Sequence, residues 1–453
     1  MTHATAQDKT TARTLIVGLG VTGLSCARFL ASQGVPVAVA DSRNEPPGLA
    51  ALNAEFPDTA VFLGPFDDQL FASVERLVVS PGVPVSTPQI AAAQRRGIPV
   101  IGDIELFARA ATAPVVAITG SNGKSTVTTL LGEMAKASGV RVAVGGNLGT
   151  PALDLLDPKV ELYVLELSSF QLETTESLQA AVATVLNVSP DHMDRYSDMD
   201  TYAAAKARVM RGAGVGVLNA DDPVAAAMLG ADDAWYFTLG ESQDAKMFGV
   251  CSIDEQDYLC RGEQPLFAAA ELKIPGLHNR ANALAALAMG SALGFDLTAM
   301  LEVLRVFPGL PHRTQFVAEI NDVRWYNDSK GTNLGASIAA LQGLHCGDVS
   351  RTVLIAGGDC KGADFSAFAS VLECCARGVV LIGRDADRIA SAVPATIPHV
   401  YAKTMEDAVT QAAAMALPGD RVLLSPACAS FDMFTNYAQR GERFVQAVRR
   451  LAA

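Results

Sequence analysis

The sequence contains no long hydrophobic run, and no uninterrupted apolar stretch approaches the ~18 residues that a membrane span needs. Its first 13 residues are polar and carry no hydrophobic signal segment, so we expect a flexible tail at residues 1–13 and a cytoplasmic protein. Positive charge is in deficit, since 35 Lys and Arg residues face 48 Asp and Glu residues and the net charge is −13. That balance argues against nucleic acid as a partner.

The eight cysteines include no CxxC pair and no spacing to histidine that is typical of a metal site. Cys374 and Cys375 are adjacent, and the others are scattered. We therefore expect buried, reduced thiols of the kind found in the cytosol.

Apolar residues are abundant, at 50% against 18% charged, so the chain can bury large cores. At ~150 residues per domain, 453 residues predict about three domains. Strand-like and helix-like segments alternate, so we expect an α/β protein of three domains, each on a mainly parallel sheet. The first and last sheets would be Rossmann-like, and the central domain would carry a phosphate loop. We place these domains at residues 14–110, 111–310 and 311–453.

The central domain opens with the strongest motif. Residues 115–118 (VVAI) form a β-branched apolar run that is typical of a buried parallel strand, and a helix follows from Lys124 to Ala137. The glycine turn between them would point free N–H groups at a phosphate, and Lys124 would reach the β- and γ-phosphates. Because Ile118 stands where GxxxxGK[ST] has its first glycine, the loop is shorter than the standard one or differently wound. The predicted nucleotide triphosphate site comprises Gly120, Ser121, Asn122, Gly123, Lys124, Ser125 and Thr126, with a hydroxyl of Ser125 or Thr126 on magnesium.

The first domain carries a dinucleotide fingerprint. The expected strand at 14–17 runs into GLGVTG at 18–23, and a second strand ends at Asp41. Glycines allow the tight turn, and an acid about 20 residues on would bind ribose hydroxyls. Taken alone this pattern points to NAD, although the same phosphate-binding logic serves other nucleotides.

Five titratable residues, at expected strand ends, in a turn and on a helix, have two readings each. Glu166 fits a magnesium ligand at the γ-phosphate, or equally a carboxylate that caps the next helix. His192 could be a metal ligand or base, but a histidine in a turn is more often structural. Lys206 lies on the expected helix 199–211, where a solvated lysine is favoured. Lys330 and Lys361 each follow the end of an expected strand. Each could bind an anion there, or be a loop lysine with no partner.

Five segments in order carry a family resemblance. The stretches GSNGKST (120–126), DHMDR (191–195), HN (278–279), NDSK (327–330) and SPACAS (425–430) together resemble the Mur ligases of bacterial cell-wall synthesis. The resemblance covers the whole chain after the tail. It is greatest to the members that add D-glutamate to UDP-N-acetylmuramoyl-L-alanine.

The resemblance implies an ATP-dependent amide ligation through an acyl phosphate, and such phosphoryl transfer depends on positioning and charge neutralisation. The catalytic residues would be Lys124, Glu166, His192, Lys206 and Lys330. Two magnesium ions would be held by Ser125, Glu166, His192 and Lys206, with Lys206 carbamylated because magnesium prefers an anionic oxygen ligand. Further ATP contacts would come from Asn279, Asn282, Arg313 and Asp328.

The resemblance also implies the two other substrate sites. The UDP-linked substrate would contact Val21, Thr22, Asp41, Ser42, Arg43, Gly82, Asn147 and His192, so that the fingerprint serves UDP in place of NAD. D-glutamate would contact Thr332, Lys361, Ser430 and Tyr437. The family commonly has Phe at position 437 and Ala at Gly331, so the acceptor pocket of this chain differs. The expected partners are these small molecules, with no nucleic acid, and the protein is expected to be a monomer in the bacterial cytoplasm.

Three other functions explain part of the pattern. A related ligase could add another amino acid or extend folate with glutamate, although the UDP-type first domain argues against folate. A nicotinamide-dependent oxidoreductase would explain residues 18–41 but leave the phosphate loop, Glu166 and Lys330 unused. A non-catalytic sensor of UDP-sugar or ATP is the third.

Overall fold

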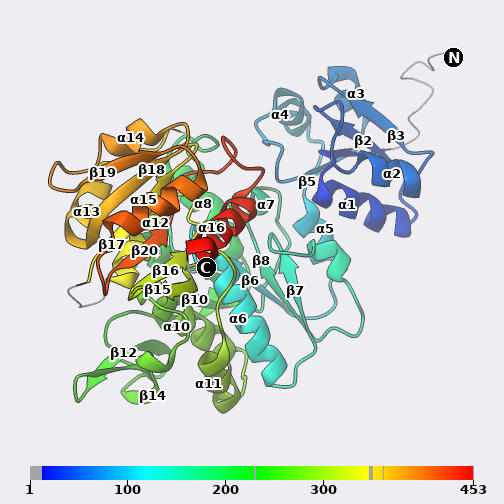
Figure 1. The fold of residues 1–453 in the computed structure, drawn as a ribbon. Coiled ribbons are helices and arrows are strands. Elements are labelled where there is room, and N and C mark those ends of the chain that lie inside the picture. The colour runs from blue at the N-terminus through cyan, green and yellow to red at the C-terminus, as the bar shows by residue number, and fades with distance from the viewer. Residues whose placement is uncertain (1–12, 229–230, 346–349, 361, 452–453) are drawn as a thin grey trace.

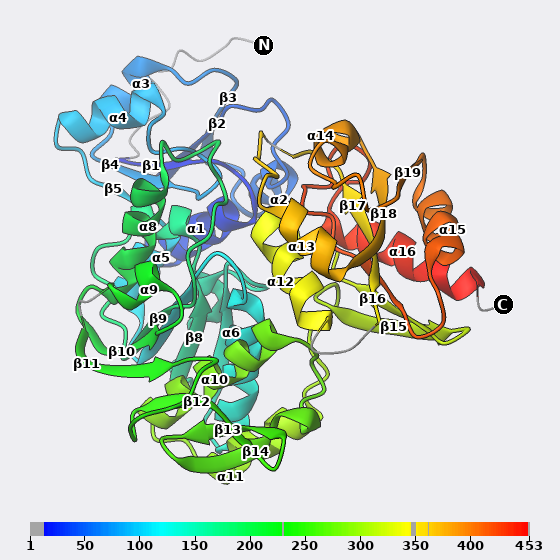
Figure 2. The same cartoon turned by 90° about the vertical axis from the view of Figure 1, so that its left-hand side faces the viewer.

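The computed structural model describes residues 13–228, 231–345, 350–360 and 362–451. The chain forms three lobes, each around its own sheet, with the blue N-terminal lobe and the orange C-terminal lobe both bordering the cyan and green central lobe (Figures 1 and 2). This confirms the prediction of three α/β domains. The sheets lie within residues 14–101, 115–268 and 315–424, and the exact domain boundaries stay a prediction. No helix in the described part of the chain is long and apolar enough to cross a membrane.

The N-terminal sheet is entirely parallel, with strand order β3-β2-β1-β4-β5. Because the chain reverses direction across the sheet between β1 and β4, the loops after these strands open into a crevice at their carboxyl ends. The strands are β1 (Thr14–Val17), β2 (Val37–Asp41), β3 (Ala60–Leu63), β4 (Arg76–Val79) and β5 (Val100–Ile101), and the helices are α1 (Val21–Ser32), α2 (Leu49–Glu55), α3 (Asp68–Ser73), α4 (Pro88–Arg95) and α5 (Asp103–Ala110).

The central sheet has strand order β14-β13-β12-β11-β10-β9-β6-β8-β7 and is parallel from β7 to β12. Its last two strands pair antiparallel, an extension that the sequence pattern did not predict. The strands are β6 (Val115–Thr119), β7 (Val142–Gly146), β8 (Leu162–Glu166), β9 (Val182–Val185), β10 (Ala213–Asn219), β11 (Ala231–Phe237), β12 (Met247–Ile253), β13 (Gln256–Arg261) and β14 (Gln264–Ala268). The helices are α6 (Lys124–Ala137), α7 (Ser169–Glu173), α8 (Met199–Ala207), α9 (Pro223–Ala226), α10 (Leu277–Ala292) and α11 (Leu297–Val306), with short 3-10 turns η2 (Ala152–Leu155), η3 (Arg208–Met210) and η4 (Ala269–Glu271).

The C-terminal sheet has strand order β15-β16-β20-β17-β18-β19, and all its pairs are parallel except the edge pair β15–β16. The strands are β15 (Gln315–Ile320), β16 (Val323–Asn327), β17 (Thr352–Gly357), β18 (Ala376–Ile382), β19 (His399–Ala402) and β20 (Arg421–Leu424). The helices are α12 (Leu334–Leu344), α13 (Phe368–Cys375), α14 (Ala386–Ala390), α15 (Met405–Met415) and α16 (Tyr437–Leu451).

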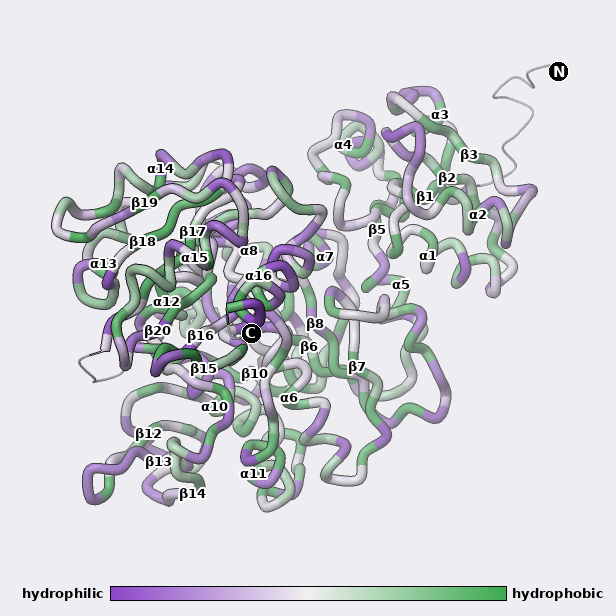
Figure 3. Tube along the Cα trace, viewed as in Figure 1, coloured by the Kyte–Doolittle hydropathy of each residue, from purple (hydrophilic) through white to green (hydrophobic). Residues whose placement is uncertain are grey.

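Alternate residues of the central strands serve two different cores. In β6, Val116 and Ile118 pack with α6 and α10, while Val115 and Ala117 pack on the opposite face, in a core that also holds Phe107 of α5. Figure 3 shows hydrophobic residues following the inner strands, and hydrophilic residues on the outer helix α16. Both faces of β6 are buried, which explains why its sequence is a continuous apolar run and does not alternate.

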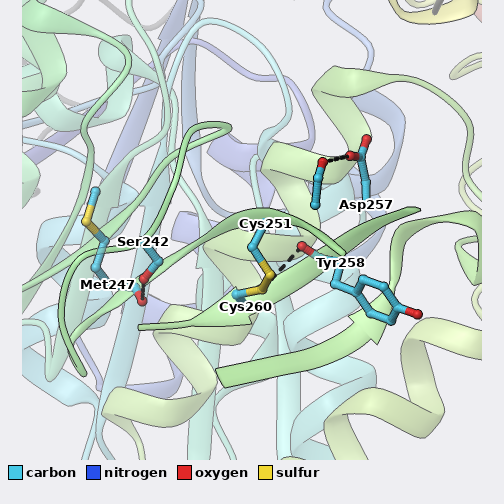
Figure 4. Close-up of a disulfide and its surroundings, with 7 residues drawn as sticks. Ser242, Met247, Cys251, Asp257, Tyr258 and Cys260 are labelled. Carbon is cyan, nitrogen blue, oxygen red and sulfur yellow. Dashed lines mark hydrogen bonds between the residues drawn. A yellow bond between two sulfur atoms is a disulfide. The ribbon is translucent and has the colours of Figure 1, made fainter. Parts of the chain in front are cut away.

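The expectation that all thiols are reduced is wrong for one pair. Cys251 on β12 and Cys260 on β13 form a disulfide, drawn in Figure 4. The two cysteines share one face of the antiparallel pair, because Cys251 lies opposite Tyr258 and Cys260 opposite Gly249. The spacing alone did not signal this pairing, since it depends on a hairpin that was not predicted.

Candidate functional site

The glycine turn after β6 has the shape of an anion cradle. Gly123, immediately before α6, has φ +84°, and a Cβ there would lie 2.4 Å from the side-chain oxygen of Asn282. Both facts require glycine at this position. The first turn of an α-helix carries N–H groups without a partner inside the helix, so a helix start at this turn suits a phosphate.

Lys124 folds back over this turn. Its Nζ donates hydrogen bonds to the carbonyl oxygens of Gly120 (2.8 Å) and Ser121 (2.9 Å). Burial lowers the pKa of Lys124, and the charge of Arg313 lowers it further, against the opposite effect of Glu166. Within the described residues, no carboxylate lies within ion-pair distance of this ammonium, so an anionic ligand would be its first strong partner.

Glu166 ends β8 directly beside the turn and is buried. Its Oε2 accepts from Ser125 Oγ at 2.5 Å, and its Oε1 accepts from Asn147 Nδ2 at 2.6 Å. The next helix is capped by Ser168 in a capping box, so the reading of Glu166 as a helix cap is wrong. The carboxylate of Glu166 and the hydroxyl of Ser125 together offer hard oxygen ligands of the kind that magnesium prefers.

Cations from the C-terminal domain reach this cluster. Arg313 Nη2 donates to Ser125 Oγ at 2.6 Å. Lys330 lies with its Nζ 4.1 Å from the centre of the Tyr437 ring, and burial together with the charge of Arg313 lowers the pKa of Lys330 to about 8. The two domains therefore share one positively charged site.

A cavity of about 310 Å³ continues from the glycine turn between α10 and the C-terminal domain. It is lined by Asn279 and Asn282, with Asp328 and Lys330 on the other side. Asp328 accepts from Thr314 N (3.0 Å) and Ser425 Oγ (2.6 Å), and burial raises its pKa to about 6. Seven of the eleven residues predicted to contact ATP line this cavity, namely Asn122, Gly123, Thr126, Asn279, Asn282, Arg313 and Asp328, whereas Gly120, Ser121, Lys124 and Ser125 do not.

Lys206 corrects the expectation of a solvated lysine. Its side chain is buried, its Nζ donates to the carbonyl of Gly120 at 2.8 Å, and it lies 4.4 Å from the Tyr202 ring centre. Burial and the nearby charge of Lys124 lower its pKa well below the usual range. Helix α8 also ends at Ala207, earlier than the predicted residue 211.

His192 lies in the same region in a left-handed backbone conformation, with φ +58°. Its ring meets Phe170 edge-on at 4.8 Å, and its Nε2 lies 3.7 Å from Asp191 Oδ2. A non-glycine residue at positive φ is strained, and such strain is common at functional sites. Asp191 also accepts from Asn333 Nδ2 of the C-terminal domain at 2.9 Å, so this turn joins two domains.

In the N-terminal domain, the predicted UDP residues lie at the carboxyl ends of neighbouring strands. Val21 and Thr22 begin α1, Asp41 ends β2, and Gly82 follows β4. Asp41 Oδ2 accepts from Leu19 N at 2.7 Å and pairs with Arg43. Burial would raise the pKa of Asp41, but its hydrogen bonds to Arg43 and Leu19 lower that pKa to about 2. Ser42, between Asp41 and Arg43, is exposed. Asn147 lies away from this group and donates a hydrogen bond to Glu166.

Three positioning residues escaped the sequence reasoning. Arg195 donates to the carbonyls of Pro81 and Val83, both at 3.2 Å, and so ties the DHMDR turn to the N-terminal domain. Asn333, the N-cap of α12, contacts Asn122 at 3.3 Å as well as Asp191. Arg440 is buried in α16 and donates to Ser329 and Cys428. Arg195 stands inside the quoted motif DHMDR, but only the fold shows which carbonyls Arg195 and Arg440 meet.

A second cavity, of about 700 Å³, lies between the DHMDR turn and the C-terminal domain. It is lined by Thr332, Ser430 and Tyr437, three of the predicted acceptor residues, and by His192 and Lys330. The fourth, Lys361, lies outside the described residues. The cavity borders Lys330, which also lines the first cavity, so a group at Lys330 faces both.

Three family models match the chain in succession. They are described as Mur ligase MurD-like, N-terminal domain (residues 12–102), Mur ligase middle domain (118–290) and Mur ligase, glutamate ligase domain (312–428). Together they cover most of the chain.

Curated relatives match over nearly the full length. A protein of Nitrosococcus oceani is 53% identical over 453 residues, which is 100% of this chain and 99% of the relative. A protein of Marinobacter nauticus is 54% identical over 433 residues, which is 95% of this chain and 97% of the relative. Both are named UDP-N-acetylmuramoylalanine–D-glutamate ligase.

Solved structures share the fold at low identity. UDP-N-acetylmuramate-alanine ligase MurC of Thermotoga maritima aligns with TM-score 0.60 and 18% identity, covering 97% of this chain and 99% of that one. MurF of Acinetobacter baumannii aligns with TM-score 0.59 and 16% identity, covering 97% and 92%. With three successive family models and relatives more than half identical along its length, this chain belongs to the Mur ligase family.

Proposed function

We propose that this protein is an ATP-dependent amide ligase that adds D-glutamate to UDP-N-acetylmuramoyl-L-alanine in peptidoglycan precursor synthesis. The observation that carries the proposal is the meeting of two domains at the phosphate loop, where Arg313 donates to Ser125 Oγ and Lys330 lies between the two cavities. The names of the full-length relatives support this choice of substrates.

The first step would transfer the γ-phosphoryl group of ATP to the alanine carboxylate. Lys124 and the N–H groups of α6 would neutralise the phosphates, and Lys330 would contact the transferring group from the other domain. Ser125 and Glu166 would hold magnesium, which supplies charge neutralisation between the phosphates. Asn279, Asn282, Arg313 and Asp328 would contact the rest of ATP, in the cavity that they line or border.

A second magnesium would be held by His192 and a carbamate on Lys206. Carbamylation needs a neutral amine, because the nitrogen attacks carbon dioxide and releases one proton. Burial, which lowers the pKa of Lys206, favours that neutral form. Labelled bicarbonate should give one carbamate carbon signal that is missing in Lys206→Ala, and full activity of that variant would contradict the assignment.

The UDP-linked substrate would lie along the carboxyl ends of β1, β2 and β4, on the residues predicted for it. Asp41 would act mainly by shaping the glycine loop, since its carboxylate already binds Leu19 N and Arg43. Asn147 would act through Glu166. Calorimetric titration should show tighter binding of UDP than of NADH, and the reverse order would favour the oxidoreductase reading.

D-glutamate would enter the larger cavity, where its amine attacks the acyl phosphate and phosphate leaves. Thr332, Ser430 and Lys361 would bind its carboxylates, and the Tyr437 ring would serve as a wall. Losing one charge-assisted hydrogen bond costs about 1.5–3 kcal/mol, so Ser430→Ala and Lys361→Ala should each raise KM for D-glutamate ten- to over a hundredfold. Lys403→Ala, an exposed lysine of the same domain, is the matched control.

The decisive experiment is phosphate release with UDP-N-acetylmuramoyl-L-alanine, ATP and D-glutamate. Lys124→Ala should abolish release while leaving binding of the UDP substrate intact, whereas the exposed Lys136→Ala of the same helix should behave as wild type. Equal loss of both properties would mean that the loop is structural. Release with L-glutamate or a folate acceptor, but not with D-glutamate, would assign a related ligase instead. We further propose that the protein is a monomer in the cytoplasm. Sedimentation of the purified protein at micromolar concentration measures the mass of the particle and so tests whether it is a monomer.

A further inference from the structure

Two buried thiols lie at the wall of the larger cavity, and one of them lines it. Cys360, at the end of the loop after β17, and Cys428, in the loop after β20, bring their sulfur atoms within 2.7 Å of each other. Their exposed fractions are 4% and 1%. Cys360 lines the cavity, and Cys428 lies behind Ala427 and Ala429, which also line it.

The two loops are held together independently of the sulfurs. Asp359 and Ala429 exchange two backbone hydrogen bonds, of 3.0 and 2.9 Å. Cys360 N donates to Asp385 Oδ2 at 2.8 Å, and the Cys428 carbonyl accepts from Arg440 at 3.1 Å. Because both main chains are fixed, the sulfur contact is built into the fold and does not depend on a mobile side chain.

The two sulfurs differ in access. Cys360 borders the cavity, so a small oxidant can reach it by the route that the acceptor would use. The hydrogen bond between the thiols and burial together raise the pKa of Cys428 above its ordinary range. Cys428 therefore keeps its proton, and Cys360 is the sulfur that meets an oxidant first.

We propose that Cys360 and Cys428 are a redox modification site, which a peroxide entering through the acceptor cavity converts into a disulfide. The Cys360 sulfur attacks one oxygen of hydrogen peroxide, giving a sulfenic acid and water. The Cys428 sulfur then displaces the sulfenic oxygen, the new sulfur–sulfur bond forms, and a second water leaves. A thiol reductant reverses the reaction by thiol–disulfide exchange.

The modification would act on acceptor binding. A disulfide draws the sulfurs from 2.7 Å to about 2.05 Å, and the part of this movement that rotation of the two side chains does not absorb strains the hydrogen-bonded loops and shifts them against each other. Ser430 stands two residues after Cys428, and hydrogen bonds to a carboxylate tolerate only a few tenths of an ångström. The inference rests on the proposed function, because it takes the cavity to be the D-glutamate site.

The test uses the full-length protein with Cys374→Ser, which removes an exposed free thiol. Peroxide treatment followed by peptide mass spectrometry should show the Cys360 and Cys428 peptides joined, with two hydrogens lost. In Cys428→Ala, the same treatment should leave a sulfenic acid on Cys360 that dimedone traps. D-glutamate should slow both reactions several-fold, and L-glutamate should not.

Kinetics give the second readout. Oxidation should raise KM for D-glutamate about fivefold or more and leave KM for ATP within about twofold, and dithiothreitol should restore both. Cys428→Ala should show no peroxide-dependent joining of peptides. If the reduced enzyme saturates normally with D-glutamate but no joined peptide forms, or if the joined form keeps its KM, the redox inference is overturned alone. If D-glutamate neither saturates the reduced enzyme nor protects Cys360, the acceptor assignment and the inference both fail.

Discussion

Arg440 offers the sharpest test of how the fold positions Lys330. This guanidinium is buried in α16, and its exposed fraction is 1%. It donates to Ser329 Oγ (3.0 Å), Ser329 O (2.8 Å) and Cys428 O (3.1 Å), and burial lowers its pKa to about 10. One side chain therefore joins the residue before Lys330 to the loop that carries Ser430.

Replacing Arg440 with lysine keeps the charge but removes the planar fork. An ammonium on a shorter stem can satisfy one of the three acceptors, so two hydrogen bonds are lost. At about 1–1.5 kcal/mol net for each, unfolding of the C-terminal domain should become easier by about 2–3 kcal/mol. Because Ser329 precedes Lys330, we also expect kcat to fall at least about tenfold through misplacement of that ammonium.

Trp325 can report the stability change. The chain has two tryptophans, and Trp325 packs beside Phe444 of α16, so in a Trp235→Phe background its fluorescence follows the C-terminal domain. Urea titration of Arg440→Lys gives the free energy difference, with exposed Arg443→Lys on the same helix as the control. A change below about 0.5 kcal/mol together with an unchanged kcat would refute the reasoning, since surface substitutions already vary by that amount.

Three further predictions concern the proposed substrate and metal sites. Lys330 must be protonated to neutralise a phosphoryl group and its pKa is lowered to about 8, so kcat/KM for ATP should fall up to tenfold per pH unit above pH 8, and a flat profile to pH 9.5 would contradict its role. Glu166→Gln should weaken magnesium binding and lower kcat about a hundredfold, because a carboxylate ligand is lost. Titration of the reaction rate with magnesium measures both effects, and an unchanged magnesium response would show that Glu166 is not a metal ligand. Arg195→Lys should raise KM for the UDP substrate about tenfold and leave KM for ATP unchanged, and Arg141→Lys, at an exposed arginine, is the control. Equal effects on both substrates would show that Arg195 does not act through its hydrogen bonds to Pro81 and Val83.

Local sequence decided the parts of the protein that depend on neighbours in the chain. The run at 115–118 predicted β6, because a strand buried on both faces needs apolar residues throughout. Gly123 and Lys124 predicted a phosphate loop, since the left-handed turn and the helix start depend on a few adjacent residues. The three mainly parallel sheets followed from the alternation of strands and helices, whereas the antiparallel strands at the edge of the central sheet did not.

Tertiary structure alone decided what depends on burial and on partners far along the chain. Lys206 looked like a solvated helix residue, but α8 packs beside the phosphate loop and buries its ammonium against Gly120 O. The sequence left Glu166 equally open as a magnesium ligand or a helix cap. Its role as a partner of the phosphate loop depends on Ser125, 41 residues away, which donates a hydrogen bond to it. The Cys251–Cys260 disulfide required the β12–β13 hairpin, and the contact of Arg313 with Ser125 required two domains to meet. Whether such contacts form depends on the free energy of the whole folded arrangement relative to its competitors. No local pattern of residues therefore encodes them.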